Sequence, residues 1–260
     1  MIRHAAPALL AAAILSALPC VPAARAADVV VMASGGMAAS LRALAPDFAR
    51  SGDHLVLVRG PSMGATSDAI PARLARGERC DVVAMVGGAL DGLHAKGLVG
   101  AGTVMAMSPI GVVVRAGAPH PAIGTPDALR RTLLDAPSVA FSDSASGVYV
   151  SHDLFRRLGI EDQMRDKARM IPETPVAQIV AGGGAAIGFQ QISEILPVKG
   201  AELVGPIPQS LQKLTPFAVA PCRDAPDPAG GRAFIRFLSS GTAREAMRSS
   251  GLDPVGRATP

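Results

Sequence analysis

The stretch DVVVMASGGMAASLRALAPDFARSG, residues 28–52, decides the fold class of this chain. It begins with a short valine-rich run, passes through the turn SGG, and continues into a segment where Leu41, Leu44 and Phe48 recur at helical spacing. Pro46 predicts a kink or an early end of that helix. A strand, a tight turn and a helix in this order form the repeating unit of an α/β fold.

The same unit returns along the rest of the chain, which predicts mostly parallel sheets flanked by helices. The expected strands are residues 28–33, 54–58, 80–86, 108–117, 138–142, 185–189, 201–207 and 214–222. The expected helices are residues 37–52, 67–77, 89–99, 128–134, 148–160, 176–184, 191–197 and 230–247.

Two α/β sets are joined by long apolar β segments near residues 109–115 and 214–221, so we expect two lobes with paired crossings between them. Lobe 1 is expected to comprise residues 27–109 and 220–260, and lobe 2 residues 110–219. The last helix is expected to return to lobe 1.

Residues 1–26 have the pattern of a secretory signal peptide: a basic start, a short apolar core and a small-x-small site at 24–26. Removing them lowers the formal charge from +4 to +2, which is too mild to indicate a nucleic-acid partner. No later apolar run is long enough for a membrane helix, so a soluble exported protein is expected. The histidines and cysteines show no metal-ligand spacing, and no metal or cofactor is expected. Cys80 and Cys222 either pair as a disulfide or stay as two buried thiols.

Four helices are preceded by short turns of small, uncharged residues: SGGM (34–37), GPSMGATS (60–67), SASG (144–147) and ETPV (173–176). A helix N-terminus has unpaired N–H groups and partial positive charge, and serine adds a hydroxyl donor. In an α/β sheet these turns lie at the carboxyl ends of strands, where ligands bind. The pattern predicts a shared anion site, against the simpler interpretation that each serine only caps its helix.

The segments ASGGMAASLRALAPDFARSG, GPSMGATSDAIPARLARGERCDVVAMV, DSASGVYVSHDLFRRLGI and VAGGGAAIGFQQISEIL together resemble the periplasmic molybdate-binding protein family. The resemblance implies a two-lobed type 2 periplasmic binding protein fold with two crossover strands, closing on an oxyanion such as molybdate or tungstate. It implies binding by Ser34 and Ser62, by the backbone at Ser146 and Val176, and by Gln191, where the family has a tyrosine. The neighbouring turn residues Gly35, Met63, Ser144 and Gly147 complete the expected ligand-binding set.

Glutamine at position 191 differs from tyrosine in reach and adds an acceptor, so a small organic acid anion is the second candidate ligand. Arg59 and Gln190 are possible carboxylate partners, and Tyr149 is a possible cleft residue. The family further implies an inner-membrane ABC permease as partner and a monomeric state. A ligand-sensing partner of a membrane sensor kinase is an alternative with the same lobes.

Residues 60–64 also fit G-x-S-x-G, the nucleophile elbow of serine hydrolases, with Ser62 as nucleophile. That fold places several strands before its nucleophile, and Pro61 fits poorly in a strained elbow. The last histidine is His152, which leaves over a hundred residues without a possible base. The chain is therefore expected to bind a ligand and not to be an enzyme.

Overall fold

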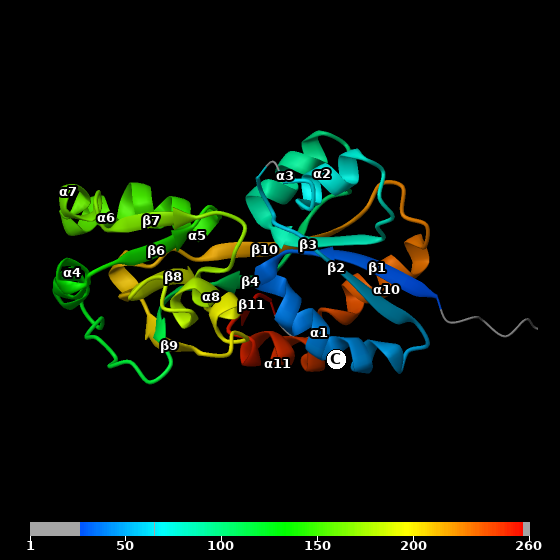
Figure 1. The fold of residues 1–260 in the computed structure, drawn as a ribbon. Helices are drawn as coiled ribbons and strands as arrows, with labels where there is room; N and C mark the ends of the chain where they lie inside the picture. Colours follow the sequence, from blue (N-terminus) through cyan, green and yellow to red (C-terminus); the bar gives the residue numbers. More distant parts are fainter. Residues whose placement is uncertain (1–26, 65, 257–260) are drawn as a thin grey trace, which may run out of the picture.

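The computed structural model describes residues 27–64 and 66–256 and has two α/β lobes side by side (Figure 1). The expected signal peptide lies outside the described residues. Each lobe is built on its own sheet, and helices cover both faces of each sheet. No helix in the described part of the chain has the length and apolarity needed to cross a membrane.

Lobe 1 contains a six-stranded sheet in the order β11-β4-β10-β3-β1-β2. Its strands are β1 (Asp28–Ala33), β2 (His54–Arg59), β3 (Val82–Val86), β4 (Thr103–Ser108), β10 (Thr215–Pro221) and β11 (Asp253–Pro254). Its helices are α1 (Gly35–Ala49), α2 (Ile70–Ala75), α3 (Gly87–Ala95), α10 (Pro228–Phe237) and α11 (Gly241–Ser249). One sheet face packs on α1, α10 and α11 through Leu41, Phe48 and Phe234, and the other on α2 and α3 through Ile70 and Leu90.

Lobe 2 contains a five-stranded sheet in the order β7-β6-β8-β5-β9. Its strands are β5 (Ile110–Arg115), β6 (Val139–Ser142), β7 (Ala168–Ile171), β8 (Ile187–Gln191) and β9 (Ala201–Pro206). Its helices are α4 (Pro126–Asp135), α5 (Ala145–Tyr149), the π-helix η1 (Val150–Leu154), α6 (Phe155–Leu158), α7 (Glu161–Met164), α8 (Val176–Ala181) and α9 (Ile192–Ile195).

The chain passes between the lobes twice, first at Pro109 between β4 and β5, and again through 207–214 between β9 and β10. The second passage contains the 3₁₀-helix η2 (Gln209–Leu211). The segments expected as crossings, near 109–115 and 214–221, are strands of the two sheets, β5 and β10, and the connections between the lobes, called the hinge below, lie directly before each of them. The two-lobed α/β fold is confirmed.

The sheets are mixed, so the expectation of mostly parallel sheets is wrong. The three strands β2, β1 and β3 are parallel, as are β7, β6 and β8, but the crossover strands β10 and β5 run antiparallel to their neighbours. A chain that leaves a lobe along one strand and re-enters along another has to run in the opposite direction there. In each sheet the strand pairing therefore changes from parallel to antiparallel at the crossover strand.

Local differences from the sequence-based prediction have simple causes. Residues 103–108 form β4, which the sequence-based prediction missed. No turn signal separates this segment from the apolar residues of β5 that follow Pro109, so the two strands were not distinguished. The expected helix 230–247 is two helices, because Ser240 accepts a hydrogen bond from Ala243 N and starts α11. Helix α1 continues through Pro46 to Ala49.

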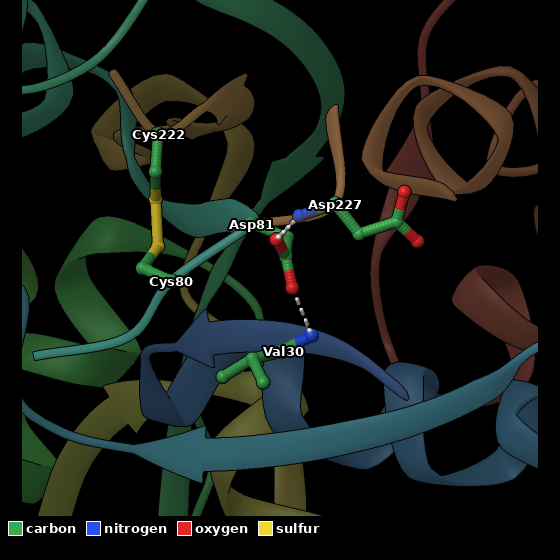
Figure 2. Close-up of a disulfide and its surroundings, with 5 residues drawn as sticks. All are labelled: Val30, Cys80, Asp81, Cys222 and Asp227. Atoms are coloured by element: carbon green, nitrogen blue, oxygen red, sulfur yellow. Dashed lines mark hydrogen bonds between the residues drawn. A yellow bond between two sulfur atoms is a disulfide. The ribbon is translucent and has the colours of Figure 1, made fainter. Parts of the chain in front are cut away.

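A disulfide joins Cys80, just before β3, to Cys222, just after β10 (Figure 2). Beside it lies Asp81, a fully buried carboxylate that accepts hydrogen bonds from Val30 N at 2.8 Å and Asp227 N at 2.7 Å. These partners belong to β1 and to the turn before α10, so Asp81 links the start of β3 to both of them. The disulfide links the start of β3 to the end of β10.

Candidate functional site

A cleft of about 240 Å³ lies between the two lobes, at the carboxyl ends of their parallel strands. Lobe 1 contributes Ser34, Gly35, Arg59, Gly60, Pro61, Ser62, Met63, Asp68, Val86 and Phe217. Lobe 2 contributes Ser142, Asp143, Ser144, Ala145, Glu173, Thr174, Pro175, Gln190, Gln191 and Glu194. The four turns singled out in the sequence therefore meet at one cavity, which is sized for a molecule smaller than a drug-like ligand.

Ser34 lies at the N-terminus of the long helix α1 and faces the cleft. Its side chain makes no capping hydrogen bond, and its Oγ is buried without a partner among the described residues. A buried hydroxyl without a partner costs free energy, so such groups usually have a role beyond the fold. The capping interpretation therefore does not account for the Ser34 side chain.

Ser62 lies in the loop that follows β2 and is 7% exposed. Its Oγ accepts a hydrogen bond from Val86 N at 3.3 Å, which anchors the loop to the end of β3. Among the described residues that line the cleft there is no histidine to act as a base toward Ser62. Its hydroxyl hydrogen remains available for a ligand.

Lobe 2 presents a cluster of three serine hydroxyls at the start of α5. Ser142 Oγ lies 2.7 Å from Ser144 Oγ and 3.3 Å from Ser146 Oγ. Ser142 and Ser144 line the cleft, whereas Ser146 is fully buried behind them. Ser144 makes no side-chain cap to α5. The hydroxyl groups of this cluster can donate hydrogen bonds into the cleft, as the hydroxyl of Ser34 can.

Gln190 and Gln191 are both 3% exposed, and the structure uses their amides inside the protein. Gln190 accepts from Ala177 N at 2.9 Å and donates to Glu194 Oε2 at 3.1 Å. Gln191 contacts Thr215 Oγ1 at 2.8 Å, and with this hydroxyl donating, its NH₂ reaches Ser108 O at 3.0 Å. Gln191 therefore links β8 to β10 and β4, the strands next to the two crossings. These contacts use most of the hydrogen-bonding capacity of its amide.

Other expected residues lie outside the cleft lining. Tyr149 donates its hydroxyl to Leu211 O at 2.5 Å, near the second crossing, because α5 turns its side chain away from the cavity. Val176 is fully buried on α8, while Thr174 and Pro175 before it line the cleft. Gly147 is buried against the backbone of Ser142. Gly35 and Met63 do line the cleft.

The charged groups of the cleft are one cation and four carboxyls. Arg59, at the end of β2, makes no ion pair or side-chain hydrogen bond to any described residue. Asp68, Asp143 and Glu173 are exposed, so water screens their charge. Glu194 is mostly buried, and this burial raises its pKa to about 7, helped by Asp143 and opposed by the Gln190 hydrogen bond and Arg59.

Glu194 was missed in the sequence, because an acidic residue on the short segment ISEI reads as an ordinary helix-start residue. Its position after a strand that carries two other cleft residues was the available signal. Ser142 was missed because it ends a strand and is not itself part of a turn motif.

The chain is similar over most of its length to known proteins. Residues 29–253 match a family described as bacterial extracellular solute-binding proteins. A curated relative from Pseudomonas sp., 44% identical over 249 residues and covering 95% of both chains, is named aconitate isomerase. The periplasmic molybdate-binding protein of Azotobacter vinelandii has a TM-score of 0.69 at 17% identity, with 86% of this chain and 98% of that chain covered. PEB3 of Campylobacter jejuni, solved with L-phospholactate, has a TM-score of 0.69 at 16% identity, with 87% and 99% covered.

The expectation that the chain is not an enzyme is contradicted by the relative named aconitate isomerase. The expectation was based on the absence of metal, triad and cofactor motifs, and an isomerisation by proton transfer requires none of these. The two-lobed structural relatives share only the fold at their level of identity. With the family match over 29–253 and the full-length relative, the chain belongs to the bacterial extracellular solute-binding protein family.

Proposed function

We propose that this protein is an isomerase of a small tricarboxylate, aconitate or an acid of the same shape, held between the two lobes in the periplasm. Aconitate has three carboxylates on a three-carbon alkene, and its cis and trans forms interconvert without oxidation or reduction. The observation that carries the proposal is the layout of the cleft: separate donor groups on both lobes together with one arginine. Such a layout suits a substrate with several anionic groups better than a single tetrahedral ion.

Each carboxylate has a candidate partner. Ser34, with the N-terminal N–H groups of α1, offers one anion position in lobe 1. The Ser142–Ser144 hydroxyls offer a second in lobe 2. Arg59 offers a third, and its planar guanidinium matches a carboxylate in two parallel hydrogen bonds. The relative named aconitate isomerase, which aligns over 95% of the chain, supports aconitate as the substrate.

Capture of a ligand for an inner-membrane ABC permease is the second candidate function, and membership in the solute-binding family favours it. A molybdate- or tungstate-type oxyanion is its leading ligand, and a small organic acid anion is the alternative. The two functions differ in one property: the enzyme converts its ligand, whereas the transport component releases it unchanged.

The test is to incubate the purified protein with pure cis-aconitate and, separately, pure trans-aconitate, and to follow both isomers by proton NMR. We expect both reactions to reach the same isomer ratio. Calorimetry with molybdate, tungstate and sulfate is run on the same protein. Absence of any interconversion, together with tight oxyanion binding, would replace the isomerase with the transport function.

Replacing Arg59 with methionine is expected to raise the KM for trans-aconitate about 10- to 100-fold, because a charge-assisted carboxylate contact is worth about 1.5–3 kcal/mol. Arg59→Lys keeps the charge but loses the paired geometry and should give an intermediate KM. Steady-state kinetics measure both. The matched control is Arg42→Met, on the exposed side of α1 and away from the cleft lining. Equal KM values for the Arg59 and Arg42 variants would remove Arg59 from the binding site.

Replacing Ser34 with alanine is expected to weaken substrate binding about tenfold without lowering the free energy of unfolding. Its hydroxyl has no hydrogen-bond partner among the described residues, so we expect its removal to cost the fold nothing. Ser240→Ala is the matched control, because Ser240 does cap α11, accepting from Ala243 N at 3.2 Å. That variant should lose about 1 kcal/mol of stability and keep its affinity. Urea denaturation and calorimetry distinguish the pair; the reverse pattern would make Ser34 a simple cap.

A further inference from the structure

Among the four carboxyl groups of the described residues that line the cleft, Glu194 is the one that is mostly buried, and it lies among hydrogen-bond donors suited to an anion. It lies on α9, three residues beyond Gln191, and its Oε2 accepts the hydrogen bond from Gln190 Nε2 at 3.1 Å. Gln190 is itself fixed by Ala177 N at the start of α8. The carboxyl group is therefore held in one orientation by side-chain and backbone contacts within lobe 2.

The other oxygen of Glu194 reaches across to lobe 1. A Cβ added to Gly35 would collide with Glu194 Oε1, so the carboxyl lies directly against the first residue of α1. Ser34, whose Oγ has no hydrogen-bond partner within the described part of the chain, directly precedes Gly35. Glu194 Oε1 thus lies at the point where the two lobes meet and where one substrate carboxylate is proposed to bind.

A site that only captured anions would gain nothing from this carboxyl group, because a negative charge there repels the ligand. The groups that face it are Gln190, Arg59 and Asp143, and Asp68 and Glu173 line the same cleft. Their combined effect, with burial, leaves the pKa near 7 and so makes both the protonated and the ionised form accessible at neutral pH. That is the property a group needs to take a proton and to return it.

We propose that Glu194 is the catalytic residue that carries the proton during the isomerisation, an inference that rests on the proposed function. The Glu194 carboxylate removes a proton from the methylene carbon of aconitate. The electron pair of that C–H bond forms a new double bond to the central carbon. The former double bond takes the proton back from Glu194 at its far carbon.

The step balances without any oxidant, reductant or cofactor. One C–H bond breaks and one forms, the double bond moves by one position, and Glu194 ends as the carboxylate it was at the start. Because the aconitate skeleton has a carboxylate on each of its three carbons, the product is again aconitate. Its geometry, cis or trans, is set by how the cleft holds the terminal carboxylate during the transfer.

The surrounding groups fit this assignment. As the proton leaves, negative charge spreads onto the carboxylate attached to the same carbon. Hydrogen-bond donors fixed in position stabilise such developing charge, and Ser34 with the N-terminus of α1 lies beside Glu194. Gln190 is a positioning residue, because it contacts Glu194 and the α8 backbone and holds the carboxyl group still.

The decisive experiment is Glu194→Gln, which keeps shape and removes the proton-accepting group. We expect kcat for aconitate to fall about 10²- to 10⁴-fold, while the calorimetric Kd for trans-aconitate changes less than threefold or becomes tighter. In D₂O, deuterium entry into the methylene position should slow by the same factor as kcat. Glu194→Asp, which keeps a carboxyl one methylene shorter, should retain at least tenfold more activity than Glu194→Gln. The control is Glu161→Gln, exposed on α7 and outside the cleft lining, with unchanged kcat.

The pH profile and the thermal melt give independent readouts. In the wild type, kcat/KM should fall as the pH drops below about 7, since the protonated carboxyl cannot accept a proton. The raised pKa also means that ionisation of Glu194 destabilises the folded state as the pH rises from 4.5 toward 7. The Tm of Glu194→Gln should therefore exceed the wild-type Tm by an amount that grows as the pH rises over this range. The same thermal melt shows that the variant folds.

The outcomes separate the two proposals. An active wild type with Glu194→Gln within threefold of its kcat would overturn Glu194 as the proton carrier and leave the isomerase intact. A wild type that fails to interconvert the aconitates would overturn the proposed function itself, whatever Glu194 does to stability. A loss of kcat together with an equal loss of affinity would reduce Glu194 to a binding or structural role.

Discussion

Replacing Gly147 with alanine is expected to lower the free energy of unfolding by at least about 3 kcal/mol and to remove most of the activity. Gly147 lies in α5 with ordinary helical backbone, so alanine is conformationally acceptable there. A Cβ at this position, however, would collide with the carbonyl oxygen of Ser142 and lie 2.8 Å from its nitrogen. Backbone atoms cannot move away as a flexible side chain does, so β6 and α5 have to separate.

That separation also moves the hydroxyl cluster of Ser142 and Ser144, which is the proposed donor group of lobe 2. Urea denaturation and aconitate turnover measure the two effects. Gly92→Ala is the matched control, since Gly92 lies inside α3 with open space around it and should gain about 0.5–1 kcal/mol. A Gly147→Ala protein that unfolds at the wild-type urea concentration would show that the close approach is not a constraint.

Removing the disulfide by the double substitution Cys80→Ser and Cys222→Ser is expected to cost about 3–5 kcal/mol of unfolding free energy. The two cysteines are 142 residues apart in sequence, so the bond closes a long loop and greatly restricts the unfolded chain. In the folded state it joins β3 and β10 next to their last ladder pair, Val82 and Pro221. The fold already holds these segments together, so the native geometry should survive the change.

Urea denaturation of the oxidised wild type, the reduced wild type and the double variant gives the measurement. The reduced wild type and the variant should unfold at the same urea concentration. Turnover without urea should be unchanged in the double variant, because neither cysteine lines the cleft. A difference below about 1 kcal/mol between oxidised wild type and variant would mean that the disulfide does not stabilise the protein by restricting its unfolded chain.

Much of the site was predictable because its donors belong to local patterns. Each of the four turns follows a strand, and the cleft lies at the carboxyl ends of those strands. Ser34 and Ser62 could be chosen from the sequence because both lie in such turns and because the family resemblance implies binding at these two positions. The local pattern could not show whether a serine caps its helix or, like Ser34, has no hydrogen-bond partner among the residues that the structure describes.

The same limit applies to Gln191 and Tyr149. Both lie in motifs that resemble binding loops, yet one is bound to the hinge and the other to Leu211 on the second crossing. Their partners come from segments more than twenty residues away along the chain. Position in a motif therefore placed these side chains near the site without fixing what they contact.

The sequence by itself determined the alternation of strand, turn and helix, the two lobes, and the small neutral donors at the helix starts, because these follow from periodicity and turn chemistry within a few residues. Only the tertiary structure decided that Glu194 of lobe 2 lies against Gly35 of lobe 1, beside Ser34 and within the field of Arg59. The physical reason is that a carboxyl group acquires a pKa near 7 from burial and neighbouring charges. The burial and the neighbouring charges both depend on segments of the two lobes that come together only in the tertiary structure.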